Sequence, residues 1–200
     1  MLKFARIKNK ITMATKKMLI VVDPQLDFIN GTLPVPGAES AMNSLTQYIR
    51  EHGDDYLVRI VTSDWHPYRH CSFQPEGGEW PRHCVQHSAG AAIWQPLLEA
   101  LNEARGGFTL LYKGTAVNKD EYSIMQNGKS AMVIGQLIAA MQLDQVDVCG
   151  LAGDVCVLNT VRDLVDVAGA KMIHVLADYA PSLDGGTALH EYIAANGLQA

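Results

Sequence analysis

The chain has 200 residues, of which 48% are hydrophobic, and this is enough to build one α/β domain with a sizeable core. Its formal net charge of -5 at pH 7 argues against nucleic acids and anionic membranes as partners, because both need a basic surface. The longest apolar runs have the length of strands and fall far short of the ~20 residues that span a bilayer, so we expect a soluble protein.

The cysteines and the N-terminus indicate the compartment. The four cysteines form neither a C-x-x-C pair nor a dense framework, which favours reduced thiols and a cytoplasmic location. Residues 1–17 are basic and lack the continuous apolar core of a secretory signal. We interpret them as a disordered extension or an over-long start, with a transit peptide as the alternative, ahead of a single domain over residues 18–200.

Strand-like and helix-like segments alternate along the chain. Apolar, β-branched runs too short for helices predict strands over residues 18–22, 56–62, 108–112, from 146 to the turn at 150, and 171–177. Helices are predicted over residues 38–52, 91–105, 129–142, 154–168 and 186–196. This order predicts a Rossmann-like, three-layer α/β/α fold with a central parallel sheet of five to six strands. Residues 65–90 show no clear period, and a loop of that length is usually functional or disordered.

Residues able to do chemistry follow the ends of several predicted strands. Asp23, Asp64 and Lys113 each lie at the end of a different strand, and Cys156 lies in the turn after a fourth. Ligands of parallel sheets bind beyond the carboxyl ends of the strands. We therefore expect these four side chains to meet at one rim of the sheet. Polar surface residues without a common function would seldom all lie at strand ends in this way.

Cys156 is a candidate nucleophile because a helix is predicted to begin there. Free N–H groups and the helix dipole stabilise a thiolate and can hold an oxyanion. A lysine beside an aspartate favours the ionised forms of its partners, so Asp23 could take the thiol proton and return it to a leaving amine. Taken singly, Cys156 could be a core thiol, Asp23 a turn cap and Lys113 a solvent-facing lysine.

One loop carries a mixed oxygen and nitrogen donor set, which suits Zn²⁺, Fe²⁺ or Mn²⁺. The candidate ligands are Asp64, His66, His70 and His83. An extended backbone would place the Asp64 and His66 side chains on the same face. Surface histidines are the alternative explanation, and Cys71 and Cys84 remain spare candidates.

Aromatic side chains lie near the same rim in sequence. Aromatic walls favour a flat ring as ligand. Core or loop packing explains Trp65 equally well, so we single out Phe28 and Trp80, which neighbour Asp23 and His83.

Five motifs occur in a recognisable order. They are Asp23-Pro24-Gln25-Leu26-Asp27-Phe28, Asp64-Trp65-His66-Pro67 with His70-Cys71-Ser72-Phe73, Trp80-Pro81-Arg82-His83-Cys84-Val85, Tyr112-Lys113-Gly114, and Gly150-Leu151-Ala152-Gly153-Asp154-Val155-Cys156-Val157. Together they resemble the signature of the nicotinamidases, which belong to the isochorismatase-like cysteine hydrolases. The resemblance runs from residue 18 to the end.

The resemblance implies a metal-dependent amidohydrolase that converts nicotinamide to nicotinate and ammonia through a cysteine thioester, in NAD salvage. It implies a catalytic triad of Asp23, Lys113 and Cys156. It also implies one divalent ion, in the first place Zn²⁺, with Fe²⁺ or Mn²⁺ as alternatives. His70 would be either a further ligand of this ion or a contact of a metal-bound water. The implied ligands are Asp64, His66 and His83.

The same resemblance implies a cis peptide between Leu151 and Ala152, which would aim the Ala152 N–H, with that of Cys156, into an oxyanion hole. Phe28 and Trp80 match positions that flank the substrate ring, and Tyr122 falls where the family often lines the pocket. The expected partner is a small molecule, nicotinamide, and a homo-oligomer is left open. The family usually adds a final strand where this chain stops, so we expect a sixth strand to be abbreviated or missing.

Two other functions compete. One is a related hydrolase acting on a ureido, carbamoyl or isochorismate-like substrate, although these relatives generally lack the metal set and isochorismatases also lack the cysteine. The other is a non-catalytic metal-binding module on the same fold, which would have no need of Asp23, Lys113 and Cys156 together.

Overall fold

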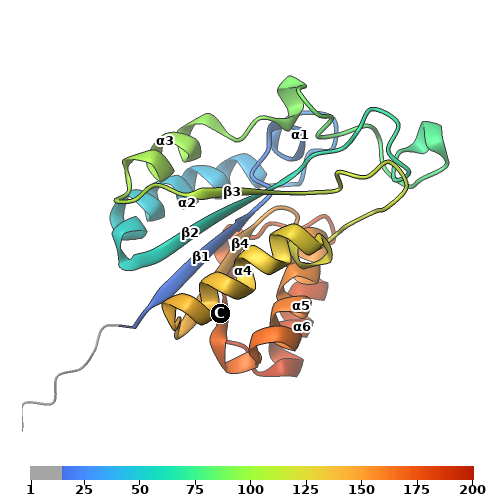
Figure 1. Cartoon of the computed structure of the whole chain (residues 1–200). Helices are drawn as coiled ribbons and strands as arrows, with labels where there is room; N and C mark the ends of the chain where they lie inside the picture. The colour runs from blue at the N-terminus through green and yellow to red at the C-terminus, as the bar shows by residue number, and fades with distance from the viewer. Residues whose placement is uncertain (1–14) are drawn as a thin grey trace, which may run out of the picture.

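The computed structural model describes residues 15–200, and these form one sheet of five parallel strands in the order β3-β2-β1-β4-β5 (Figure 1). The strands are Lys17–Val22 (β1), Tyr56–Asp64 (β2), Thr109–Lys113 (β3), Gln145–Gly150 (β4) and Ile173–Val175 (β5). The predicted α/β class with a parallel sheet is confirmed. Because all strands point the same way, their carboxyl ends share one edge of the molecule.

Helices cover both faces of this sheet, which gives the predicted three layers. α2 and α3 lie on one face, and α4, α5 and α6 lie on the other (Figure 1). The helices are Leu26–Ile29 (α1), Ala38–His52 (α2), Gln95–Glu103 (α3), Gly128–Met141 (α4), Leu158–Ala168 (α5) and Thr187–Asn196 (α6).

The central strand β1 shows how the sequence builds two cores. Successive side chains of a strand point to opposite faces. Met18, Ile20 and Val22 accordingly pack into the core under α4, α5 and α6, while Leu19 and Val21 pack into the core under α2 and α3. All five are fully buried. Burying an aliphatic side chain of this size contributes about 1.5–3 kcal/mol, so β1 anchors both layers.

Two helix predictions needed correction. The helix expected over residues 91–105 begins only at Gln95, because Ala89–Ala91 forms a 3₁₀ turn and Pro96 suits the first helical turn but not a helix interior. The helix expected from residue 154 opens with a π-helical turn, Gly153–Val157, before α5 begins. The short helix α1 was not predicted, since four residues are too few to show a period.

The last strands are shorter than expected. The strand predicted over residues 171–177 is reduced to Ile173–Val175 between the 3₁₀ turns Ala170–Met172 and Ala177–Tyr179. The sixth strand is represented by one bridge between His174 and Gln199, whose carbonyl accepts the Val175 N–H at 2.8 Å. The sheet therefore has five strands, with the abbreviated sixth that the resemblance suggested.

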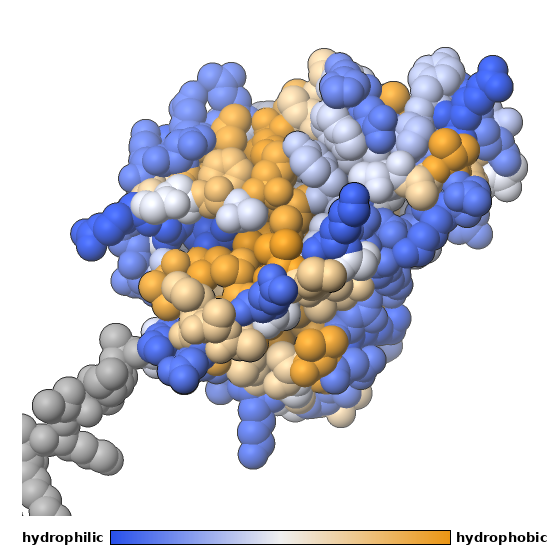
Figure 2. Space-filling model, in the orientation of Figure 1, coloured by the Kyte–Doolittle hydropathy of each residue, from blue (hydrophilic) through white to orange (hydrophobic). Residues whose placement is uncertain are grey.

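The ends and surface of the described chain add three facts. The expectation of disorder over residues 1–17 falls mainly on residues 1–14, which lie outside the described part, and Lys17 already belongs to β1. None of the helices in residues 15–200 combines the length and apolarity needed to cross a membrane. A hydrophobic band crosses the face where β3 and α4 lie (Figure 2).

Candidate active site

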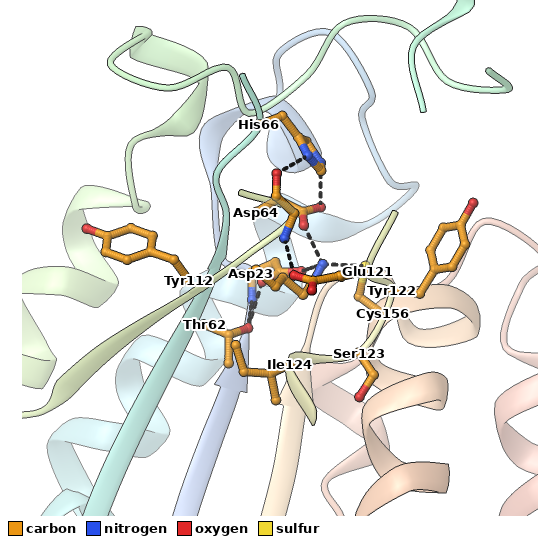
Figure 3. Close-up of polar contacts among 12 residues, drawn as sticks. Asp23, Thr62, Asp64, His66, Tyr112, Glu121, Tyr122, Ser123, Ile124 and Cys156 are labelled. Carbon is orange, nitrogen blue, oxygen red and sulfur yellow. Dashed lines mark hydrogen bonds and ion pairs between the residues drawn. The ribbon is translucent and has the colours of Figure 1, made fainter. Parts of the chain in front are cut away.

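Four polar side chains meet at the carboxyl edge of the sheet, as their positions at strand ends suggested. Asp23 directly follows β1, Asp64 ends β2, Lys113 ends β3, and Cys156 lies in the π-helical turn after β4. All four are buried, and Asp23 and Lys113 have no exposed surface at all. Figure 3 shows Asp23, Asp64 and Cys156 directed toward a common centre.

Lys113 is the cation at that centre. Its Nζ lies 2.9 Å from Asp23 Oδ2 and 3.5 Å from Cys156 Sγ, and it donates a hydrogen bond to Asp64 Oδ1. The hydroxyl of Thr62, on β2, donates to Asp23 Oδ1 at 2.6 Å. Asp23 Oδ2 receives no aligned hydrogen bond from residues 15–200, despite the close ammonium group. A carboxylate oxygen of Asp23 lies within 4.8 Å of the Cys156 sulfur, so this carboxylate is placed to accept the thiol proton.

The carboxylates of Asp23 and Asp64 differ in proton affinity, because their surroundings shift the two pKa values in opposite directions. Burial raises the pKa of Asp23 by more than Lys113 lowers it. Burial acts in the same direction on Asp64, but Lys113 and His66 outweigh it, so the pKa of Asp64 falls. The pKa of Lys113 is raised despite burial, because both carboxylates face it. Asp23 is therefore the better base of the two, opposite a permanent cation.

The thiol differs from the expectation drawn from the helix start. Burial raises the pKa of Cys156 well above its ordinary value, and the nearby Lys113 offsets only part of this effect. Burial thus favours the protonated thiol over the thiolate, which is opposite to the effect expected from the start of a helix.

Asp64, His66 and His83 form a second group beside this centre. Each offers one atom to a set in which all atoms lie within 4.8 Å of one another. Asp64 Oδ2 is 3.5 Å from His66 Nε2 and 3.8 Å from His83 Nε2. The opposite ring nitrogens contact backbone carbonyls, His66 Nδ1 at Gly114 O (3.1 Å) and His83 Nδ1 at Pro81 O (2.8 Å). A ring whose Nδ1–H is held in this way presents the lone pair of Nε2, as metal-binding histidines do.

His70 lies next to this group but outside it. Its Nδ1 is 2.7 Å from Ser72 Oγ, and its Nε2 is 2.9 Å from the carbonyl of Lys119. Its ring lies 4.1 Å from that of His66, centroid to centroid. Both ring nitrogens thus contact groups of the protein, and the roles expected for His70, as a ligand or as a contact of a metal-bound water, stay predictions.

A pocket with about 420 Å³ of empty space opens onto the sulfur. Phe28, Trp80 and Tyr122 line it, and Trp80 Nε1 donates to the Tyr122 hydroxyl at 3.2 Å. Trp65 does not line it and packs against His87 and Tyr112 instead. Sequence reasoning missed further lining residues: Leu33, Val35, Ser72, Asp120, Glu121, Val155 and Leu183. Ser72 and Val155 belong to motifs quoted above but were not singled out, and the other residues lie outside those motifs.

The turn before Cys156 has the backbone that the resemblance implied. The peptide between Leu151 and Ala152 is cis. Ala152 lines the pocket together with Cys156, and its N–H donates to no acceptor among residues 15–200. A free amide at this place fits the oxyanion-hole role suggested for it.

Comparisons with known proteins agree with this geometry. The isochorismatase domain family model matches residues 17–184. Nicotinamidase of Escherichia coli is 32% identical over 183 residues, 81% of each chain, and nicotinamidase/pyrazinamidase of Mycobacterium tuberculosis is 32% identical over 156 residues, 74% of this chain and 78% of that one.

Solved structures give the same result. Pyrazinamidase of Pyrococcus horikoshii in complex with zinc superposes with a TM-score of 0.77 at 28% identity, covering 92% of this chain and 97% of that one. PnC1 of L. infantum in complex with nicotinate has a TM-score of 0.77 at 27% identity, covering 94% and 92%. The chain is thus a hydrolase of the isochorismatase domain family. Within that family it belongs to the nicotinamidases, as its motifs indicated.

Proposed function

We propose that the protein hydrolyses nicotinamide to nicotinate and ammonia through a thioester on Cys156, as a cytoplasmic step of NAD salvage. The observation that carries this proposal is the Lys113 ammonium group, held between Asp23 and the Cys156 sulfur where the pocket meets the metal-type donor set. The nicotinamidase relatives and the nicotinate bound to the L. infantum protein support the choice of substrate.

A divalent cation fits the group formed by Asp64, His66 and His83. One carboxylate and two imidazoles with free Nε2 atoms are a donor set typical of Zn²⁺, with Fe²⁺ or Mn²⁺ as alternatives. The zinc in the Pyrococcus horikoshii structure supports zinc as the first choice. When bound, such an ion offers a coordination position to a ring nitrogen and so orients an azine substrate.

The protein's own residues account for the proton transfers. Asp23 Oδ2 takes the thiol proton as Sγ attacks the carboxamide carbon, and Lys113 stabilises the charges that form on both. The backbone N–H groups of Ala152 and Cys156 would receive the oxyanion. Asp23 then protonates the departing ammonia, which leaves a thioester. Finally Asp23 takes a proton from water as the water oxygen adds to the thioester carbon. Asp23 returns this proton to the Cys156 sulfur as the C–S bond breaks, and the acid that is released ionises to nicotinate.

The apolar walls select the ring. Phe28 and Trp80 come from separate segments of the chain, and Tyr122 is tied to Trp80 by its hydroxyl. Aromatic walls bind a planar heteroaromatic ring by stacking and burial, and extended ureido substrates have no comparable surface to offer.

An ammonia-release assay tests the proposal. The purified protein should release ammonia from nicotinamide, and a strong chelator should abolish the release until Zn²⁺ is restored. Release from a carbamoyl compound but not from nicotinamide would move the protein to another hydrolase of the family. Release from neither, with metal bound, would favour the binding-module alternative.

A further inference from the structure

Glu121 is a buried carboxylate that the proposed mechanism does not use. Its Oε2 accepts the backbone N–H of Gly114 at 2.9 Å and Nδ2 of Asn127 at 3.1 Å, and its Oε1 accepts Nζ of Lys119 at 2.7 Å. Figure 3 shows the side chain pointing toward the polar cluster that includes Asp64 and His66. Burial opposes ionisation of Glu121, yet these hydrogen bonds outweigh it and lower its pKa. Three donors occupy the carboxylate, so it is built to hold neighbouring groups in place.

The first of those groups is the junction between Lys113 and Gly114. The Lys113 carbonyl accepts the N–H of Trp65 at 3.0 Å, and the Gly114 N–H donates to Glu121. Both ends of this peptide group are thereby fixed. Since Lys113 carries the ammonium group of the site, Glu121 helps to hold the backbone from which that side chain extends.

The Gly114 carbonyl, which belongs to the next peptide group, accepts the Nδ1–H of His66 at 3.1 Å. The contact between this glycine and the ring is close. Gly114 has a φ of +63°, and a Cβ built there would overlap the His66 ring at Cε1. A rotation of the Gly114 backbone would therefore be transmitted directly to the imidazole.

A second connection reaches the same ring through Lys119. Its ammonium group binds Glu121, and its carbonyl lies 2.9 Å from Nε2 of His70, whose ring stacks on that of His66. The segment 114–121 thus reaches His66 at two places: Gly114 contacts its ring directly, and Lys119 contacts the neighbouring His70. Glu121 links these two places, because it binds both the Gly114 N–H and the Lys119 ammonium group.

We propose that Glu121 is a positioning residue that, through the Gly114 amide, fixes His66 with its Nε2 facing Asp64 and His83. This inference rests on the proposed metal site. Groups that orient metal ligands from behind typically change metal affinity by about 10–100-fold when removed. Because the contact with Gly114 is a hydrogen bond to an oxygen, its geometry matters more than the charge of the side chain.

Two variants separate geometry from charge. Glu121→Gln loses the charge but keeps an oxygen that can accept the Gly114 N–H. Glu121→Asp keeps the charge but draws the carboxylate back by one methylene, which is enough to break a 2.9 Å contact. Lys119→Met is the matched control, since it removes the ion pair with Glu121 and leaves the Gly114 contact intact.

The measurement is the dissociation constant of Zn²⁺ from each apoprotein, by competition with a chromophoric chelator, below the unfolding temperature of every variant. The absorption of the Co²⁺-substituted proteins reports ligand geometry alongside. We expect Glu121→Asp to bind Zn²⁺ at least about 10-fold more weakly than wild type with an altered Co²⁺ spectrum, and Glu121→Gln and Lys119→Met to stay within about threefold.

Wild-type affinity in Glu121→Asp would overturn the inference, as would an equal loss in Lys119→Met. A greater loss in Glu121→Gln than in Glu121→Asp would also overturn it, because charge and not position would then matter. If the wild-type protein binds no divalent ion, the proposed metal site is wrong and this inference falls with it. That result differs from normal binding by all variants, which would refute only the role of Glu121. If Glu121→Asp does not fold, Glu121→Ser provides the same comparison.

Discussion

Replacing Lys113 by methionine tests the electrostatic core of the site. The substitution leaves the carboxylates of Asp23 and Asp64 buried without the cation between them. At 2.9 Å and an effective dielectric constant of about 20, the attraction between Lys113 and Asp23 is about 6 kcal/mol. The cost of desolvating both charges offsets much of it, and removing one partner of a buried pair typically costs about 3–5 kcal/mol.

Urea unfolding followed by fluorescence is the appropriate assay. Lys113→Met should lower the free energy of unfolding by about 3–5 kcal/mol. For a chain of this size, the same loss would lower the midpoint of thermal unfolding by roughly 6–20 °C. Lys129→Met is the control, since Lys129 is exposed on α4 and its replacement should cost less than about 1 kcal/mol. Activity of Lys113→Met should fall by about 10³-fold or more, as for other residues that act as a catalytic unit.

A double variant sharpens the test. Adding Asp23→Asn to Lys113→Met removes the carboxylate that the single substitution leaves unpaired. The double variant should therefore be more stable than Lys113→Met alone, by about 1–2 kcal/mol. A single variant within 1 kcal/mol of wild type, or a double variant less stable than the single one, would refute the view that Lys113 compensates buried charge.

Three further predictions concern other parts of the molecule. His66→Ala should remove bound metal, and an unchanged ratio of metal to protein by plasma emission spectrometry would argue against its ligand role. Trp80→Leu should raise KM for nicotinamide by about 10-fold or more with a smaller change in kcat, and steady-state kinetics would contradict this if only kcat fell. Burial and the hydrogen bond to Asp147 raise the pKa of Tyr56, so the stability it contributes is complete below the unfolded tyrosine pKa of about 10 and declines as pH rises above it. Between pH 9 and 11, the free energy of unfolding measured in urea should fall by about 1.4 kcal/mol less in Tyr56→Phe than in wild type, and equal decreases would contradict the shift.

The sequence predicted the parts of the fold that depend on local pattern. The alternation of short apolar runs and amphipathic segments identified all five strands and the five longer helices, because burial on two faces of a sheet imposes that pattern. The ends of β1, β2 and β3 were close enough to place Asp23, Asp64 and Lys113 on one rim. Helix α1 and the π-helical turn before α5 were missed, since neither is long enough to have a period.

The contacts that organise the site were harder to predict. Glu121 acts on Gly114 and Lys119 through a loop with no periodic sequence, and Thr62 reaches Asp23 across 39 residues of chain. Side-chain contacts of this kind depend on how loops close in three dimensions, which spacing does not reveal. The contacts of His70 with Ser72 and the Lys119 carbonyl are of the same kind, and its spacing in the sequence gave no sign of them.

Covalent catalysis by Cys156 is the central claim, and intact-protein mass spectrometry of a reaction with nicotinamide, quenched in acid during turnover, tests it most directly. The account predicts that wild type gains the mass of one nicotinoyl group and that digestion of the quenched protein assigns this mass to the peptide that contains Cys156. Cys156→Ala should show neither the adduct nor ammonia release, with metal content unchanged. Ammonia release by Cys156→Ala at the wild-type rate would contradict the account.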